Sequence, residues 1–350
     1  MEEEGNFSVA PTYFELDEDD EKDELYGHDD NTRTIAISVI LVVTVIGNGL
    51  VLNWLFVHRR ERTRIHVYMT FLALADLSVA MIPLLVSLVM TLKGNVWEST
   101  DAACRVRMLM ESMALMASSN MVVAISVDRY HSVMFPLRKQ LSEFKVIPIA
   151  FALALLLSLP QLYVFHKEDF NGTSRCQTIF TPGYDPYRQV YLIYIAVVVF
   201  VAPFLIISGA YLRIVAKLYS DGKNLFQSNW KKSTRWRTLK MTFVIIGAYV
   251  VCNLPYFTIE LVRAMAGNDS VNVVAYSIFS VFAPCSSAAN PYTFLFFNAC
   301  RTSNKNRKHG QGTSTQTAVL EHSTTPRLGR EVRAVDCAYK SSSSPVKTAI

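Results

Sequence analysis

The sequence predicts an all-α membrane protein: a seven-transmembrane helix bundle with its N-terminus outside the cell and its C-terminus in the cytoplasm. Of the 350 residues, 51% are hydrophobic and only 18% are charged, compared with about 25% charged residues in soluble domains. The apolar residues form long runs, and the basic residues gather in alternate connections between these runs. Because the basic residues lie only in short clusters, a nucleic-acid-binding protein is disfavoured.

The helices are predicted from the length of the apolar runs. A hydrocarbon core about 30 Å thick needs about 20 apolar residues in a helix. Seven stretches meet this requirement, at about 34–57, 67–92, 104–130, 146–165, 190–214, 238–262 and 271–297. The first, fourth and fifth are clear from hydropathy alone, whereas the third and seventh contain Ser, Asn and Pro and are included because they complete the topology. No internal repeat is visible, which argues against a transporter with repeated halves.

The orientation follows from the distribution of basic residues between the loops. The loops at 58–66, 131–145 and 215–237 contain 13 Lys and Arg residues, and the alternate loops contain five. Since basic loops favour the cytoplasm, the first set is predicted to be cytoplasmic. The chain then divides into an acidic extracellular tail at 1–33, the bundle at 34–297 and a Ser/Thr-rich cytoplasmic tail at 298–350. Both tails are expected to be largely disordered, and the protein to be multi-pass in the plasma membrane.

Glycosylation acceptors and cysteines agree with this topology. The N-x-[ST] acceptors Asn6, Asn171 and Asn268 all fall in segments assigned to the outside, where glycosylation occurs. Cys104, at the start of the third span, and Cys176, in the second outer loop, lie in an oxidising space where a disulfide can persist. Cys300 follows the seventh span on the cytoplasmic side and is a candidate for palmitoylation.

Asp76 lies midway along the second span. A charged residue at the centre of a membrane helix costs about 2.5–3.5 kcal/mol on insertion scales, so its presence needs a reason. One interpretation is a structural polar group bonded to neighbouring helices. The other is a hydrated pocket in which the carboxylate couples helix movement to an ion or proton. Polar residues at a similar depth are Asn48, Ser118, Ser287 and Asn290.

Two further acids, Glu111 and Glu260, are predicted near the outer mouth of the bundle. They would suit a ligand that carries a cation or several hydrogen-bond donors. Alternatively, they pair with Arg107 and Arg263.

Asp128-Arg129-Tyr130 ends the third span at the cytoplasmic face. Arg129 could extend to the lipid head groups, or Asp128 could neutralise it reversibly and form a two-state latch. Six prolines within the spans each permit a kink, and Pro255 in the sixth span is a predicted hinge. These kinks favour a bundle that rearranges.

Together these motifs resemble those of the rhodopsin-like (class A) G-protein-coupled receptors, over about 34–300. The matching residues are Gly47-Asn48, Leu74-Ala75-Asp76, Cys104, Asp128-Arg129-Tyr130, Leu159-Pro160, Pro203 with Tyr211, Cys252 to Pro255, and Asn290-Pro291. Within this family the chain is most similar to the vasopressin/oxytocin and gonadotropin-releasing-hormone/adipokinetic-hormone peptide receptors. Arg64-Ile65-His66 and Ser158-Leu159-Pro160-Gln161 are among the stretches that carry this likeness.

The resemblance implies roles for individual residues. Arg129 would engage the G protein when the sixth span swings outward, and Tyr211 would stabilise this open state. Asp76, Ser118 and Asn290 would hold an allosteric sodium ion, with no other cofactor. The residues implied in ligand binding are Glu111, Gln161, Tyr256, Phe257 and Glu260. Those implied in activation and G-protein coupling are Asp128, Arg129, Tyr130, Tyr211, Pro255, Asn290 and Pro291.

The sequence also departs from the family pattern. Asn253 replaces the usual sixth-span tryptophan below the ligand, Phe151 replaces the fourth-span tryptophan, and Phe294 replaces the seventh-span tyrosine. A basic stretch with Arg235 and Arg237 stands where an acid often pairs with the cytoplasmic arginine. These departures predict altered basal activity or an atypical ligand.

The function predicted from these features is a receptor that binds an extracellular neuropeptide or peptide hormone and activates a heterotrimeric G protein. The nearest alternative is the same fold sensing a small non-peptide cue such as a pheromone. A channel or transporter is disfavoured, and no motif indicates an enzyme. No Lys occurs between Lys240 and Lys305, which excludes a retinal-binding light sensor. Arrestin, receptor kinases and a second receptor copy are further expected partners.

Overall fold

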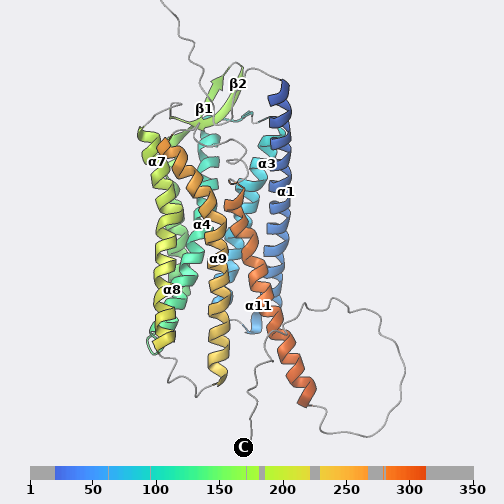
Figure 1. The fold of residues 1–350 in the computed structure, drawn as a ribbon, viewed down its shortest axis with the longest axis vertical. Coiled ribbons are helices and arrows are strands. Elements are labelled where there is room, and N and C mark those ends of the chain that lie inside the picture. The colour runs from blue at the N-terminus through green and yellow to red at the C-terminus, as the bar shows by residue number, and fades with distance from the viewer. Residues whose placement is uncertain are drawn as a thin grey trace, which may run out of the picture. The chain divides into compact units, whose positions relative to one another are not determined.

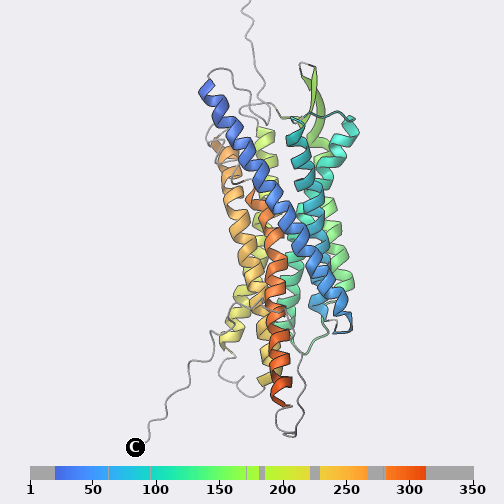
Figure 2. The same ribbon diagram turned by 90° about the vertical axis from the view of Figure 1, so that its right-hand side faces the viewer.

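The computed structural model describes residues 20–61, 63–94, 96–170, 172–180, 186–220, 229–266, 279 and 281–312. These residues are almost entirely helical and include one two-stranded sheet (Figure 1). The chain divides into two compact units, Met1–Phe294 and Leu295–Ile350. The first unit contains the helical bundle, in which α1 (Asp20–Val57, blue) runs obliquely across the other long helices (Figure 2).

Several spans consist of more than one helical segment. The helical elements, in chain order, are α1 (Asp20–Val57), η1 (Arg59–Glu61), α2 (Arg64–Val79), η2 (Ala80–Leu84), α3 (Leu85–Leu92), α4 (Asp101–Met134), α5 (Glu143–Ser158), α6 (Gln161–Val164), α7 (Pro186–Ala196), η3 (Val197–Val201), α8 (Ala202–Ser220), α9 (Asn229–Ala266) and α11 (Phe282–Gly312). Within the described residues, six stretches are long and apolar enough to cross a membrane, and they match the first six predicted spans. The seventh predicted span lies partly outside the described residues, and α11 begins within it at Phe282.

The structure differs from the predicted domain boundaries at both ends. Helix α1 already begins at Asp20, so residues 20–33, expected to be a disordered tail, are helical. Helix α11 continues past 298 to Gly312. The rest of both tails lies outside the described residues.

Prolines coincide with irregular turns in three spans. Pro83 lies within η2, and Pro203 follows η3, and both elements are π-helical turns. Proline removes a backbone donor and collides with the carbonyl four residues earlier, and a π turn relieves this by shifting the hydrogen-bond ladder. Pro160 separates α5 from α6. The predicted hinge, Pro255, lies inside the continuous helix α9.

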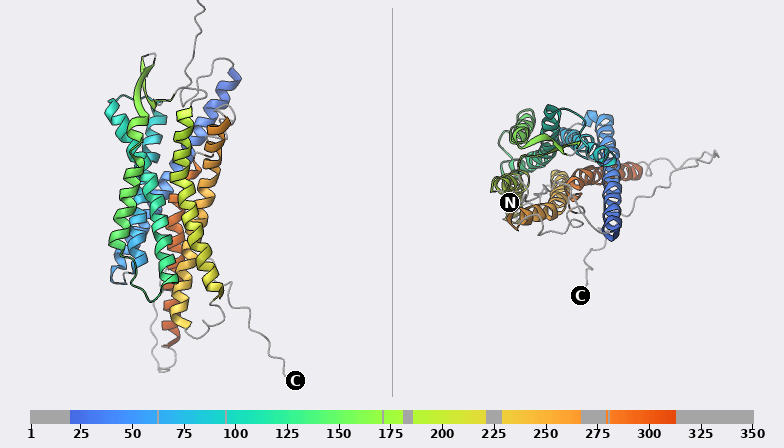
Figure 3. Two further views of the ribbon diagram at one scale, coloured as in Figure 1. Left: turned by 90° about the vertical axis from the view of Figure 1, so that its left-hand side faces the viewer. Right: turned by 90° about the horizontal axis from the view of Figure 1, so that it is seen from above.

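A β-hairpin covers one end of the bundle, which we call the hairpin end (Figure 3). Strand β1 (Phe165–Phe170) pairs antiparallel with β2 (Thr173–Thr178), and Phe165 lies opposite Thr178. Gly172 in the connection has a φ of 81°, which favours glycine. A disulfide joins Cys104 of α4 to Cys176 of β2, the pair of cysteines that the sequence places together outside the cell.

The outside of the bundle is apolar, as a bilayer requires. Large hydrophobic side chains such as Val39, Val42 and Ile46 of α1 are each more than half exposed. Inside, α4 packs against α2, α5 and α8. The core therefore lies between helices, while the outer apolar surface is the part that lipid covers.

Candidate functional site

A cluster of buried polar side chains lies inside the bundle, and we call it the polar hub (Asn48, Asp76, Ser118, Ser287 and Asn290). Asp76 has no exposed surface. One of its carboxylate oxygens, Oδ1, accepts a hydrogen bond from Ser118 Oγ at 2.5 Å, and Oδ2 accepts one from Asn290 Nδ2 at 3.0 Å. The carboxylate therefore ties α2 to α4 and α11.

The remaining hub residues extend this network to α1. Asn48 Nδ2 donates to the carbonyl of Thr44 at 3.0 Å and to that of Ser287 at 3.3 Å. The hydroxyl oxygens of Ser118 and Ser287 are 3.5 Å apart. These contacts place the polar residues that the sequence grouped by depth in one connected network.

The polar hub offers the kind of oxygen ligands that a hard cation binds. It offers a carboxylate, two hydroxyl oxygens and the Oδ1 atom of Asn290, which is buried without a hydrogen-bond partner. Hard cations bind oxygen ligands of this kind, so Asp76, Ser118 and Asn290 fit a sodium ion. Among the described residues, no group of three or more His, Cys, Asp and Glu side chains could hold a metal.

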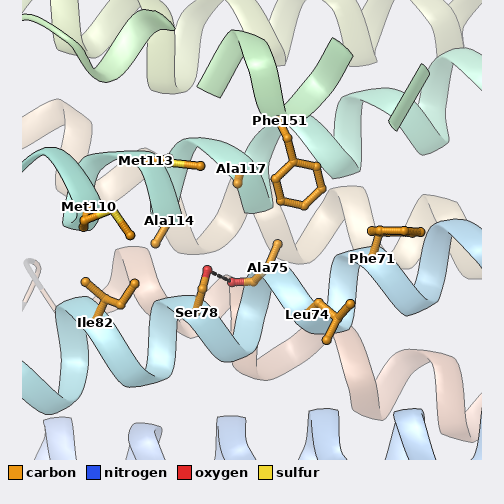
Figure 4. A pocket seen from close by; sticks show the side chains of 10 residues that line it. All are labelled: Phe71, Leu74, Ala75, Ser78, Ile82, Met110, Met113, Ala114, Ala117 and Phe151. Atoms are coloured by element: carbon orange, nitrogen blue, oxygen red, sulfur yellow. Dashed lines mark hydrogen bonds between the residues drawn. The ribbon is translucent and has the colours of Figure 1, made fainter. Parts of the chain in front are cut away.

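An apolar cleft of about 350 Å³ lies on another face of α2 and α4, where α5 also contributes (Figure 4). Its lining residues are Phe71, Leu74, Ala75, Ser78, Ile82, Met110, Met113, Ala114, Ala117 and Phe151. The Ser78 hydroxyl donates to the carbonyl of Ala75 at 2.6 Å. Leu74 and Met110 are each more than a third exposed, so the cleft opens to the outside of the bundle, and it contains none of the predicted ligand-binding residues.

A second charged cluster lies at the other end of α4, far from the hairpin. Asp128 is 1% exposed, and its Oδ2 atom binds the Arg129 guanidinium. Its Oδ1 atom accepts a hydrogen bond at 2.6 Å from Arg64, the first residue of α2. The structure thus shows the predicted contact between Asp128 and Arg129, together with a second arginine that sequence reasoning missed.

The other residues implied in activation are spread over neighbouring elements. Tyr211 of α8 is buried, and its ring lies 6.2 Å from that of Phe243 on α9. The ring of Tyr130, on α4, packs against that of Phe135, with ring centroids 6.4 Å apart. Pro291 directly follows Asn290 of the polar hub on α11.

Near the hairpin end, Glu111 and Arg107 form an ion pair one helical turn apart on α4, with 2.8 Å between Oε1 and Nε. The Arg107 guanidinium also lies 5.6 Å from the ring centroid of Trp97. Of the two interpretations of Glu111, the structure therefore shows the pair with Arg107. This i, i+4 spacing is the signal from which that pair could be predicted.

Gln161 is 5% exposed and lies between helices. Its Oε1 atom accepts a hydrogen bond from the Tyr191 hydroxyl at 2.6 Å, and its Nε2 atom donates to Ser112 Oγ at 3.4 Å. The side chain thus connects α6 to α7 and α4. Sequence reasoning missed Tyr191, because its partner lies on another span.

Two of the residues implied in ligand binding, Tyr256 and Phe257, are aromatic residues of α9. Phe257 is buried and stacks on Phe200, with 5.1 Å between ring centroids. The ring of Tyr256 lies 5.3 Å from that of Phe257. Glu260 lies one turn further along α9 and is partly buried.

Four predicted modification sites cannot be placed. Asn6, Asn171 and Asn268 lie outside the described residues, as does the side chain of Cys300 in α11.

A helical bundle with six membrane-length apolar helices among its described residues, a polar core and a disulfide-linked hairpin is typical of seven-helix membrane receptors. The family model of the 7 transmembrane receptor (rhodopsin family) matches residues 47–294. The chain therefore belongs to the rhodopsin family of G-protein-coupled receptors, which confirms the resemblance noted in the sequence. It is a multi-pass protein of the plasma membrane and a receptor rather than an enzyme.

Three of the relatives to which the chain is similar are receptors named for vasopressin, mesotocin and neuropeptide S. The vasopressin V1b receptor of Mus musculus is 28% identical and the match covers 86% of this chain and 85% of that receptor. The mesotocin receptor of Rhinella marina is 26% identical, and the match covers 75% of this chain and 72% of that receptor. The neuropeptide S receptor of Macaca mulatta is 27% identical, covering 82% of each chain.

Proposed function

We propose that this chain is a cell-surface receptor for an extracellular neuropeptide or peptide hormone and that it activates a heterotrimeric G protein. The observation that supports a peptide ligand is the similarity to receptors named for vasopressin, mesotocin and neuropeptide S. Each match covers three quarters or more of the chain. The hairpin end is assigned to the outside of the cell, in agreement with the basic loops at the opposite end.

The ligand site is assigned to the region below the hairpin, where Glu111, Gln161, Tyr256, Phe257 and Glu260 lie on α4, α6 and α9. Because Glu111 already pairs with Arg107, this part of the site presents a carboxylate and a guanidinium together. A peptide, which offers both backbone donors and acceptors, suits such a pair. The buried Gln161 amide shapes this site through Tyr191.

Activation is a shift between a closed and an open bundle. In the closed state, Asp128 holds Arg129. In the open state, α9 moves outward about Pro255, Arg129 engages the G protein, and Tyr211 stabilises the arrangement. Converting a nearly closed population into a nearly open one requires about 5.5 kcal/mol of preferential ligand binding.

Sodium is assigned to the polar hub, where Asp76, Ser118 and Asn290 would hold it and so favour the closed arrangement. Pro291 and Asn290 allow α11 to change its contacts with α2. Glycosylation of Asn6, Asn171 and Asn268 and palmitoylation of Cys300 belong to the same assignment. The Ser/Thr-rich tail would recruit receptor kinases and arrestin, and a receptor dimer is a further proposed partner.

The test is expression in cells exposed to a panel of vasopressin-type, oxytocin-type and neuropeptide S-type peptides, with calcium and cyclic AMP as readouts. We expect at least one peptide to give a saturable response that Arg129→Ala abolishes at equal surface expression. A small-molecule ligand remains the second candidate, because Asn253 replaces the usual tryptophan and is bonded to the Tyr249 carbonyl at 2.8 Å. Silence to all peptides with a response to a small molecule would overturn the peptide assignment.

A further inference from the structure

Four charged side chains of alternating sign form a chain of contacts at the end of the bundle opposite the hairpin. Glu143 Oε2 lies 3.7 Å from Arg64 Nε, and Arg64 Nη2 lies 2.6 Å from Asp128 Oδ1. The other carboxylate oxygen of Asp128 binds Arg129. We call this set (Glu143, Arg64, Asp128 and Arg129) the charge chain. It joins the first turns of α2 and α5 to α4.

Arg64 is the centre of this arrangement. Besides its two carboxylate partners, its Nη2 atom donates to the carbonyl of Leu141, immediately before α5. One guanidinium therefore contacts α4, the connection between α4 and α5, and α5 itself. Its side chain is 28% exposed, whereas Asp128 is 1% exposed, so the Asp128 Oδ1 atom is shielded from solvent and has the Arg64 guanidinium as its partner.

The alternation of sign determines how each charge acts on Arg129. Asp128 attracts Arg129 and holds it, while Arg64 repels Arg129 and competes for the same carboxylate. Glu143 draws on Arg64 from the opposite side and adds a weaker attraction for Arg129. Salt and water screen partly buried charges less than exposed ones, so charges beyond the direct partner also act on Arg129.

We propose that Arg64 and Glu143 are positioning residues that set how tightly Asp128 restrains Arg129, and through it the ligand-independent activity of the receptor. The proposal rests on the assignment of Arg129 to G-protein coupling. Arg64 weakens the restraint, and Glu143 strengthens it. Neither residue contacts the ligand region near the hairpin.

The two residues therefore have opposite effects when they are removed. Without the Arg64 charge, Arg129 loses a repelling neighbour, Asp128 has one cation to bind, and basal activity falls. Without the Glu143 charge, Arg64 turns fully to Asp128, the hold on Arg129 weakens, and basal activity rises. A partly exposed ion pair contributes at most about 1 kcal/mol, which sets about fivefold as the upper size of each effect.

A purely structural role predicts a different pattern. Arg64 also anchors the segment before α5, so loss of packing there would change basal activity in the same direction for both variants. Arg64→Lys separates charge from geometry, because lysine keeps the positive charge but lacks the planar fork that spans two acceptors. We expect Arg64→Lys to retain basal activity close to that of the unmodified receptor.

Arg105 supplies a matched control at the hairpin end. It also joins a carboxylate to a backbone carbonyl, with Nε 2.7 Å from Asp101 Oδ2 and Nη1 2.7 Å from the carbonyl of Leu162. Arg105→Gln removes an equivalent pair of contacts without altering the charge chain. Its ligand-independent activity should therefore stay unchanged.

The experiment measures nucleotide exchange on purified heterotrimeric G proteins by membranes that contain equal amounts of each receptor, without ligand. We expect Asp128→Asn and Glu143→Gln to raise exchange, the latter by about twofold to fivefold, and Arg64→Gln to lower it. If the ligand-independent exchange of the unmodified receptor is close to background, Arg64→Gln is introduced into the Glu143→Gln receptor. We expect the double variant to show less exchange than Glu143→Gln alone.

Two results would overturn the role of the charge chain in basal activity. In the first, Arg64→Gln and Glu143→Gln change nucleotide exchange in the same direction. In the second, neither variant changes exchange while Asp128→Asn raises it. A different failure concerns the proposed function itself. If Asp128→Asn stimulates none of the G-protein classes and no ligand does so either, the coupling role of Arg129 is wrong.

Discussion

Gly47 of α1 offers a sensitive test of how α1 packs on α11. A Cβ atom at this position would lie 2.8 Å from Pro291 Cγ and 2.9 Å from Tyr292 Cε2. The Pro291 ring is closed onto the backbone of α11, so its Cγ atom cannot rotate away as a flexible side chain would. Gly49, two residues further along α1, has no atom within 4 Å of the corresponding Cβ position and is a matched control.

The expected magnitude combines two effects. Forcing a methyl group into a packed interface costs about 1–3 kcal/mol, and replacing glycine by alanine within a helix gains about 0.5–1 kcal/mol. Gly47→Ala should therefore destabilise the fold by about 1 kcal/mol, whereas Gly49→Ala should stabilise it by up to about 1 kcal/mol. The two variants should differ by about 2 kcal/mol, or about 4 °C in melting temperature.

The assay is thermal unfolding of the detergent-solubilised receptor. Unfolding is monitored by the reaction of a fluorescent maleimide with the free thiols of Cys252 and Cys285. We expect Gly47→Ala to melt below the unmodified receptor and Gly49→Ala to melt at or above it. If Gly47→Ala melts as high as Gly49→Ala, the close approach of α1 to Pro291 is refuted.

Three further predictions concern other contacts. Asp76→Asn should remove the dependence of agonist affinity on sodium, measured by competition binding. An unchanged dependence would exclude the polar hub as the sodium site. Cys104→Ser opens a disulfide that spans 72 residues and should cost about 4 kcal/mol, so surface expression should fall, while Cys285→Ser should not reduce it. Tyr191→Phe removes the hydrogen bond to Gln161 and should cost about 1 kcal/mol; an unchanged melting temperature would contradict that contact.

The sequence predicted those features whose physical cause lies in single residues or local patterns. Six apolar runs match the helices able to cross a membrane. A carboxylate inside a membrane helix must find partners, which is why Asp76 could be grouped with Ser118 and Asn290 before their contacts were seen. The pair of Arg107 and Glu111 was one of two alternatives, and only the structure decides between them.

The features that were missed depend on contacts between distant segments. Arg64 meets Asp128 and Leu141, which lie 64 and 77 residues away along the chain, and no local pattern around Arg64 indicates either partner. The hairpin at 165–178 was expected only as a loop, because its strands are polar and lack the alternation that predicts a strand. Its disulfide to α4 and its contacts with the start of α4 hold it in place instead.

The central claim is that an extracellular peptide activates a G protein through Arg129. The most direct measurement is peptide-stimulated nucleotide exchange on a purified G protein, made in parallel with peptide binding, for the unmodified receptor and for Arg129→Ala. We expect the unmodified receptor to show both binding and stimulated exchange, and Arg129→Ala to bind the peptide without stimulating exchange. Full peptide-stimulated exchange by Arg129→Ala would contradict the claim.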